Sequence, residues 1–431
     1  MTITKFLIKG AQLATDEVVD ILIEGELVSK VAPEIVDDSA YVIDAAGLRA
    51  LSGLVDLHTH LREPGREDSE TVASGSLAAV KGGYTAVSAM ANTSPVADTA
   101  GVVEQVYRLG QAAGLCDVFP IGAVTQGLAG EHLAELGAMA NSVAKVRIFS
   151  DDGKCVSNAL VMRRALEYVK SFGGIIAQHA QEPTLTVDAQ MNEGEISSKL
   201  GLKGWPAIAE EAIIARDILL AEHVDSRLHI CHLTTAGGVE LVRWAKARGI
   251  KVTAEVTPHH LLLTDNLASG YDAVYKVNPP LRTQADVLAL RAGLADGTID
   301  VVATDHAPHP SEDKECEWQA AAFGMLGLET ALSVVVESMV NNGLLTWSGV
   351  EEVMSKNPAK IAGYERHGQA IAAGSFANLI LIDPKAVLTV DRNKMSSKSR
   401  NTPYHGLTLP AVVTHTFFNG RLVHQSAGGV A

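Results

Sequence analysis

Eight short apolar runs recur along the middle of the chain, separated by runs with helical spacing. They are rich in Val, Ile and Ala, as strands buried on both faces of a parallel sheet are. The apolar runs occupy residues 51–60, 84–92, 116–125, 145–152, 174–180, 227–233, 250–260 and 299–308. Amphipathic runs such as 71–83, 159–173 and 237–249 lie between them and predict helices. Eight strands alternating with helices over about 260 residues predict a (β/α)8 TIM-like barrel.

An open doubly wound sheet is the alternative architecture for such an alternation. No GxGxxG follows any of the strand runs, so nucleotide binding of that type has no support. The two ends of the chain read instead as short strands with hairpin turns at Gly25 and at Asn419-Gly420. We therefore predict a small β-sandwich domain built from residues 1–50 and 366–431, beside a catalytic α/β barrel at 51–365.

Composition limits the function classes. Lys and Arg number 35 against 50 Asp and Glu, so the net charge of −15 argues against a nucleic acid as the main partner. There is no apolar run long enough for a membrane span, and the first residues lack the features of a secretion signal. Four widely spaced cysteines without a CxxC pair suit a reducing cytoplasm, which is the expected location.

Histidine and aspartate gather where the predicted strands end, which is where barrel proteins carry their function. Residues two apart on a strand share a face, so His58 and His60 can grip one ion. The other strand ends supply Asp152, His179, His232 and Asp305. Imidazole and carboxylate suit zinc and similar divalent cations. Six such ligands exceed one tetrahedral site and match a pair of ions that share a bridging carboxylate.

Simpler interpretations exist for each of these residues. A lone HxH is a weak signal, and a single His or Asp at a strand end is commonly a cap or a loop hydrogen-bonder. The occurrence of such residues at five strand ends of one barrel is what favours a metal site. We expect His259 and His260, after the seventh strand, to support a loop, and His306 to point away from Asp305.

The strand-end residues lie in longer segments that together resemble a known family. The segments are DLHTHLREPG (56–65), MANTSPV (90–96), FSDDG (149–153), QHAQE (178–182), ICHLTT (230–235), TPHHL (257–261), VNPPLR (277–282), ATDHAPH (303–309) and FGMLGLET (323–330). They resemble the cyclic amidohydrolase superfamily, and specifically dihydroorotases of the long bacterial type. The resemblance covers nearly the whole chain. HTHLREPG followed by ATDHAPH is a specific combination, whereas HxH alone indicates only an amidohydrolase.

The resemblance implies a ligand set and a cofactor. His58, His60 and Asp305 would hold the more buried metal, and Asp305 would also shuttle the proton. A second metal would be held by His179 and His232. The cofactor would be Zn²⁺, one or two ions per chain with two favoured.

The bridging ligand needs separate argument, because many relatives bridge their metals with a carboxylated lysine. Here the fourth strand ends in FSDDG, and the resembling dihydroorotases carry Asp at the position of Asp152. Asp151 would face the opposite way, and Lys145 is more simply an exposed charge at the start of the strand. We therefore predict that Asp152 bridges the ions.

The resemblance also implies a set of substrate contacts. Arg62 would pair with a substrate carboxylate, for which its guanidinium offers a bidentate fork. Taken alone, Arg62 is more simply a surface ion-pair residue, and Asn92 could equally be a turn residue. The remaining contacts would come from His60, Asn92, His309, Asn278, Phe323 and Gly324, the last three at the edge of the pyrimidine ring.

The implied function is a zinc-dependent interconversion of N-carbamoyl-L-aspartate and L-dihydroorotate with loss of water, the third step of de novo pyrimidine (UMP) biosynthesis. One alternative is a related cyclic amidohydrolase, a dihydropyrimidinase (hydantoinase) or allantoinase, whose substrates lack the ring carboxylate. Another is a non-catalytic partner of aspartate carbamoyltransferase, against which the full ligand set argues. The resemblance also allows a homodimer and an association with that transcarbamoylase.

Overall fold

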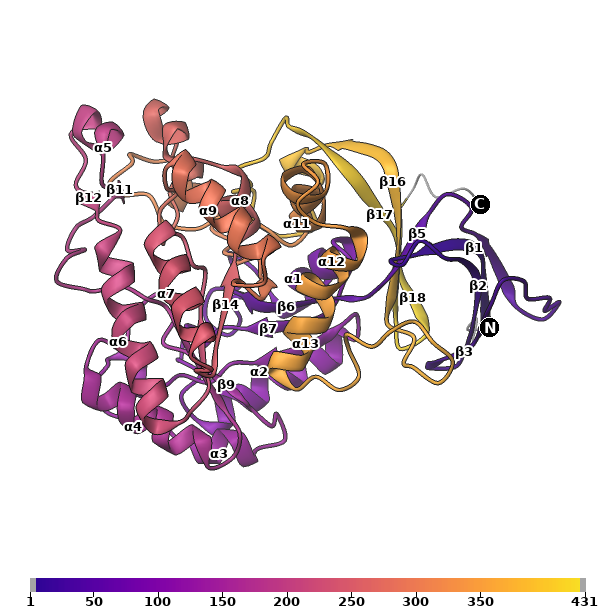
Figure 1. Ribbon diagram of the computed structural model, residues 1–431, viewed down its shortest axis with the longest axis horizontal. Helices are drawn as coiled ribbons and strands as arrows, with labels where there is room; N and C mark the ends of the chain where they lie inside the picture. The colour runs from indigo at the N-terminus through magenta and orange to yellow at the C-terminus, as the bar shows by residue number, and fades with distance from the viewer. Residues whose placement is uncertain (1–4, 427–431) are drawn as a thin grey trace.

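The computed structural model describes residues 5–426 and confirms the predicted barrel (Figure 1). Its eight parallel strands are β6 (Leu54–Thr59), β7 (Tyr84–Ala89), β8 (Asp117–Pro120), β9 (Ile148–Phe149), β10 (Ile175–Gln178), β13 (Leu228–Ile230), β14 (Val252–Val256) and β15 (Val301–Val302). They pair in the orders β6-β7-β8 and β15-β14-β13-β10-β9. Two parallel bridges, Gly122 to Phe149 and Thr59 to His306, join these sheets. The strands therefore close into one ring.

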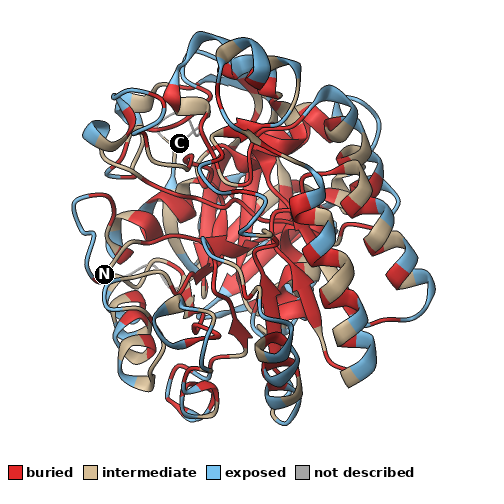
Figure 2. Cartoon of the chain, turned by 90° about the vertical axis from the view of Figure 1, so that its left-hand side faces the viewer, coloured by how far each residue is buried: buried red, intermediate tan, exposed pale blue. Residues whose placement is uncertain are grey.

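Helices surround the ring, with their outer faces exposed and the strands buried inside (Figure 2). The principal ones are α1 (Val72–Lys81), α2 (Ala100–Ala113), α3 (Leu136–Asn141), α4 (Ala159–Lys170), α6 (Ile208–Val224), α7 (Ala236–Ala247), α9 (Gln284–Ala295) and α11 (Ala331–Val335). α1 begins at a capping box in which Thr71 and Ser74 satisfy each other's backbone N–H groups. Between residues 5 and 426, no helix is long and apolar enough to cross a membrane.

Shorter elements lie in the connections between strands and helices. These are β11 (Met191–Asn192), α5 (Glu195–Leu200), β12 (Gly204–Trp205), α8 (Pro258–Leu262), α10 (Ser311–Lys314), α12 (Trp347–Glu351) and α13 (Asn357–Ala362). Ile361 of α13 joins a buried cluster with Val55, Ile148, Ile175 and Val301, which stand near the starts of their strands. α13 thus packs against the amino end of the barrel and leaves the carboxyl end for the site.

Both ends of the chain contribute to a second sheet, as predicted, and its strands lie beside the barrel in Figure 1. The strands are β1 (Lys5–Leu13), β2 (Val18–Glu24), β3 (Leu27–Ala32), β4 (Tyr41–Asp44), β5 (Arg49–Ser52), β16 (Leu379–Thr389), β17 (Thr408–Phe418) and β18 (Arg421–Gln425). Their order is β18-β17-β16-β5-β1-β2-β3, with β4 paired to β1. β5 runs across residues 50 and 51, and the boundaries 50/51 and 365/366 stay predictions.

Several strands are shorter than the expected ranges, and two of these ranges also include part of another element. The run 51–60 divides at Gly53, because Leu51 pairs with Ile380 in the second sheet while β6 belongs to the barrel. A Cβ on Gly53 would lie 2.4 Å from Thr85, so this break needs glycine. The run 250–260 ends as a strand at Val256, because Thr257 caps α8 and Pro258 suits its first turn.

Candidate metal centre

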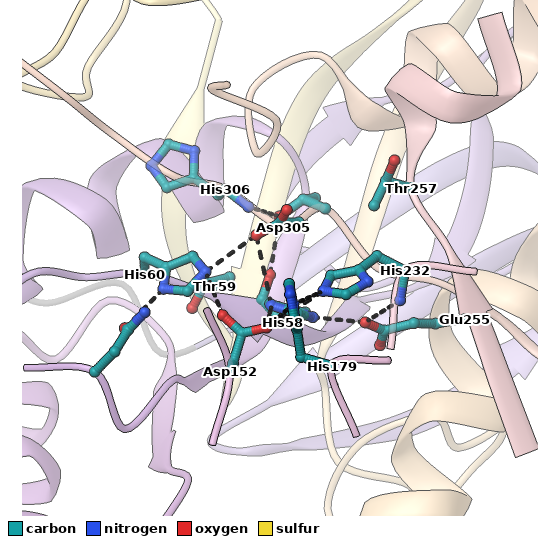
Figure 3. Close-up of polar contacts among 12 residues, drawn as sticks. His58, Thr59, His60, Asp152, His179, His232, Glu255, Thr257, Asp305 and His306 are labelled. Carbon is teal, nitrogen blue, oxygen red and sulfur yellow. Dashed lines mark hydrogen bonds and ion pairs between the residues drawn. The ribbon is translucent and has the colours of Figure 1, made fainter. Parts of the chain in front are cut away.

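Asp152 stands at the centre of the strand-end residues, at the carboxyl end of the barrel (Figure 3). Its carboxylate faces four imidazole nitrogens. Oδ1 lies 3.4 Å from His58 Nε2 and 3.3 Å from both His179 Nδ1 and His232 Nε2. Oδ2 lies 3.3 Å from His60 Nε2. Two groups with ligand geometry share this aspartate, His58–His60–Asp152 and Asp152–His179–His232, so one carboxylate can serve two adjacent ions.

The outer ring nitrogens of three histidines are held by oxygen acceptors. The pairs are His58 Nδ1 with Glu255 Oε1 at 2.6 Å, His60 Nδ1 with Asn92 Oδ1 at 2.9 Å, and His179 Nε2 with Gln181 Oε1 at 2.8 Å. Such partners fix the ring and leave the inner nitrogen free to bind a metal. His58 Nε2 is buried and has no hydrogen-bond partner among the described residues. A cation between the inner nitrogens and Asp152 would satisfy it.

The carboxylates of the centre favour a positive charge among its inner ring nitrogens. Burial alone would lower the pKa of His58, but Asp152, Glu255 and Asp305 raise it well above its ordinary value. Burial would raise the pKa of Asp152, yet His58 and the hydrogen bonds from His179 and His232 hold it well below the usual range. A divalent cation meets the same electrostatic demand as a buried proton, so the donor set fits a metal.

Glu255 is a residue that sequence reasoning missed. It lies in β14 and also accepts hydrogen bonds from His229 Nε2 at 3.0 Å and from the backbone N–H of His232 at 3.2 Å. A single charged residue inside the buried run VTAEV was the available signal. Cys231 lies close to Glu255 and His58, but burial raises the pKa of its thiol to about 12, so it is no ready thiolate ligand.

Glu255→Gln is expected to weaken metal binding about 10- to 100-fold, because the variant holds His58 with a neutral acceptor. Activity should fall at limiting metal and recover when metal is added in excess. Titration with Zn²⁺ followed by activity measurement checks this. Identical metal titrations for the variant and the wild type would show that Glu255 does not orient the ligand.

Asp305 also reaches the cluster. Its Oδ1 lies 3.0 Å from His60 Nε2 and 3.5 Å from His58 Nε2. Burial would raise its pKa, but His58 and His60 hold it at about 2. The preceding Thr304 is tied to Asp56, with the Thr304 hydroxyl donating to Oδ2 at 2.5 Å. This anchoring presents Asp305 to the centre at the end of β15.

Arg62 lies two residues beyond His60, half-buried at the mouth of the barrel. Its Nε donates to the Pro308 carbonyl at 3.1 Å, and its Nη2 lies 3.2 Å from His309 Nε2. Burial lowers the pKa of the guanidinium to about 10, so it remains a cation at neutral pH. Burial and the Arg62 charge lower the pKa of His309 to about 2, and its neutral ring donates from Nε2 to the Phe323 carbonyl at 2.8 Å.

The structure also shows what surrounds three other predicted substrate contacts, Asn92, Asn278 and Gly324. Asn92 holds His60, as described above. Asn278 Nδ2 donates weakly to Gln181 at 3.4 Å, while its Oδ1 is buried without a partner among the described residues. Gly324 has φ +145°, and a Cβ there would lie 2.9 Å from His309 Nε2, so the backbone approaches this histidine closely only as glycine.

Several residues lie outside the metal cluster. Asp151 turns to the backbone N–H groups of Val124 and Thr125, at 2.8 and 3.0 Å. His306 faces Glu70 at 3.4 Å, and Lys145 is exposed. His260 Nδ1 lies 2.7 Å from the hydroxyl oxygen of Thr257, the residue that caps α8.

His259 is buried, and burial lowers its pKa to about 4, although Asp305 acts in the opposite direction. The pKa of His259 in the folded chain therefore lies below the ordinary 6.5. When the pH falls below 6.5, the unfolded chain binds a proton at this residue that the folded chain does not bind. The free energy of unfolding should therefore decrease as the pH falls. The contribution of His259 to this decrease should reach about 2 kcal/mol at pH 5. Urea unfolding at pH 7 and pH 5 measures the loss. His259→Gln should show a shallower pH dependence, and parallel curves would contradict the argument.

The closed barrel, the second sheet and the two overlapping histidine–carboxylate groups define a barrel amidohydrolase of the metal-dependent kind. The fold is shared with L-hydantoinase (dihydropyrimidinase) from Arthrobacter aurescens, at a TM-score of 0.87 and 25% identity over 99% of this chain and 97% of the other. Dihydropyrimidinase from Brevibacillus agri NCHU1002 gives a TM-score of 0.84 at 22% identity over 99% and 96%.

Similarity in sequence identifies the family more narrowly than similarity in fold. The family described as Dihydro-orotase-like matches residues 48–237. The dihydroorotase of Streptomyces coelicolor is 65% identical over 97% of this chain and 98% of its own length. The dihydroorotase of Mycobacterium tuberculosis is 54% identical over 96% and 97%. The chain belongs to the dihydroorotase family of cyclic amidohydrolase enzymes.

Proposed function

We propose that this enzyme interconverts N-carbamoyl-L-aspartate and L-dihydroorotate with Zn²⁺ at the Asp152 centre. The observation that carries the proposal is Asp152 itself, which faces four imidazole nitrogens within 3.4 Å. Arg62 follows the HxH pair at the mouth of the same barrel. The high identity to dihydroorotases over nearly the full length supports the same reaction.

Two ions are favoured over one. His58, His60 and Asp305 would hold one ion, His179 and His232 the other, and Asp152 both. Bound there, the metal supplies Lewis acidity to a carbonyl oxygen and lowers the pKa of water. The ligand nitrogens fit this role because Glu255, Asn92 and Gln181 occupy the outer nitrogens of three of the rings.

The substrate carboxylate belongs at Arg62. A guanidinium presents two parallel N–H groups to a carboxylate, and the low dielectric of a half-buried site strengthens the pair. Asn92 and His309 would assist Arg62 at this carboxylate. His309 is neutral, so it adds no second charge beside the Arg62 guanidinium.

The pyrimidine ring edge would meet Asn278 and the backbone of Phe323 and Gly324. The buried Asn278 Oδ1 lacks a partner among residues 5–426, so a ring N–H could donate to it. The absence of a side chain at Gly324 lets the ring approach the backbone.

Asp305 is the proposed proton carrier. In ring opening its carboxylate accepts the proton of the attacking water and returns it to the ring nitrogen as that nitrogen leaves. Its low pKa keeps the carboxylate ionised at neutral pH, so it has no proton of its own when water attacks. In ring closure, with the terminal carboxyl group of the substrate in its protonated form, the same carboxylate takes a proton from the attacking nitrogen. It passes this proton to the hydroxyl group that leaves the carboxyl carbon, which departs as water.

Three substrates and metal analysis test the proposal. Purified enzyme should contain zinc and open dihydroorotate, with dihydrouracil and allantoin turned over far more slowly because neither carries the ring carboxylate. Turnover of dihydrouracil or allantoin without dihydroorotate would favour a neighbouring amidohydrolase. Absence of both metal and turnover would favour a scaffold for aspartate carbamoyltransferase.

The proposal includes a cellular role. The reaction would form the third step of de novo pyrimidine biosynthesis in the cytoplasm, with a small-molecule substrate and no nucleic-acid or membrane partner. A homodimer and an association with aspartate carbamoyltransferase are compatible with this role, and sedimentation of the enzyme alone and with the transcarbamoylase would test both.

A further inference from the structure

Two lysines near the barrel mouth are buried, which is rare for this residue type. Lys276 is 2% exposed and Lys314, at the end of α10, is 6% exposed. Neither forms an ion pair within 4.0 Å of a carboxylate in the described part of the chain. A buried ammonium without a carboxylate partner needs other acceptors to replace its water.

Those acceptors are main-chain carbonyls. Lys314 Nζ donates to the carbonyl oxygens of Ala322 at 2.8 Å, Lys276 at 3.0 Å and Gly324 at 3.1 Å. An ammonium has three N–H groups, so three converging carbonyls match its donors in number. Lys276 Nζ donates to the carbonyls of Trp318 at 2.6 Å and Gln319 at 3.2 Å.

Both lysines thus hold the segment 318–324 through hydrogen bonds to its main-chain carbonyls. The Lys276 carbonyl also accepts the backbone N–H of Gly324 at 3.0 Å, and the Lys276 ammonium lies 4.4 Å from the centre of the Phe323 ring. Asn401 adds a third hold, because its Nδ2 donates to the Gly324 carbonyl at 3.2 Å. The turn at Phe323 and Gly324 is therefore fixed by side chains from three parts of the chain.

The Phe323–Gly324 turn also holds two of the proposed substrate contacts, His309 and Arg62, in place. The Phe323 carbonyl accepts from His309 Nε2 at 2.8 Å, and His309 lies 3.2 Å from Arg62. Asn401 Oδ1 accepts the backbone N–H of His309 at 3.1 Å. A shift of the turn would move the histidine and, through it, the surroundings of the guanidinium.

We propose that Lys314 and Lys276 are positioning residues, whose ammonium groups hold the Phe323–Gly324 turn in the conformation that binds substrate. The inference rests on the proposed function for its substrate, but the hold on the turn is a property of the chain alone. The turn meets bound substrate before and during the reaction, so loss of the hold weakens binding more than it slows the chemical step.

Lys314→Met removes the three N–H donors and keeps an unbranched side chain. We expect KM for dihydroorotate to rise about 10- to 100-fold, with kcat within about threefold of the wild type. Hydrogen exchange of the amides in 318–325 should accelerate, while exchange in β10 and β13 and zinc content stay unchanged. Lys276→Met should act in the same direction and serves as the second test if Lys314→Met does not fold. Lys385→Met, at an exposed lysine on β16, is the control expected to behave as wild type.

Unchanged KM and unchanged exchange in 318–325 would overturn the proposal. It would also be overturned if kcat, melting temperature and exchange protection across the barrel all fell together, since that pattern indicates a purely structural role. If the wild-type enzyme does not turn over dihydroorotate, the proposed function fails. The exchange measurement then still decides whether the lysines hold the turn.

Discussion

Asp152→Asn is expected to remove both the metal and the activity. Asp152 is the one carboxylate in residues 5–426 that faces all four cluster histidines, and an amide offers one neutral oxygen in place of two charged ones. Loss of an outer hydrogen-bond partner of a ligand costs about 10- to 100-fold in metal affinity, so loss of the shared ligand should exceed about 100-fold. Metal analysis after gel filtration and turnover of dihydroorotate measure the two effects.

The neighbouring Asp151→Asn is the matched control. Asp151 is also buried, but its Oδ1 accepts the backbone N–H groups of Val124 and Thr125, away from the cluster. This variant should keep its metal and lose stability instead. Full metal occupancy in Asp152→Asn, or equal metal loss in both variants, would contradict the bridging role.

Arg62→Ala is expected to lower kcat/KM for dihydroorotate about 100- to 1,000-fold, the cost of leaving a charged substrate group without its partner. Metal content should stay at the wild-type level, because Arg62 contacts Pro308 and His309 and none of the proposed ligands. Steady-state kinetics with dihydroorotate and metal analysis of the same sample check both parts.

Arg66→Ala controls for the loss of an arginine from this loop. Arg66 is half-exposed and pairs with Asp68 and Asp313 at the surface, so its removal should change kcat/KM little. An unchanged apparent affinity for dihydroorotate in Arg62→Ala would refute the carboxylate role.

The alternation of apolar runs predicted the barrel because strand and helix periodicity are local properties of the sequence. The strand-end positions of His58, His60 and Asp152 were accessible for the same reason, since the carboxyl ends of barrel strands meet at one face. Their roles as metal ligands remain proposals that the geometry supports. Local patterning failed at Gly53 and Pro258, where one apolar run belongs to two elements, and periodicity alone does not show which sheet a residue joins.

The amino-acid order by itself determined the barrel, the pairing of both chain ends in one sheet and the residue types at the strand ends. Tertiary structure alone decided what surrounds them. Glu255 became the partner of His58 because β14 and β6 bring their side chains to the same barrel end, 197 residues apart in sequence. Lys314 became buried because carbonyls of Lys276, Ala322 and Gly324 converge on it. Such partners depend on where distant backbone groups meet, which no local pattern encodes.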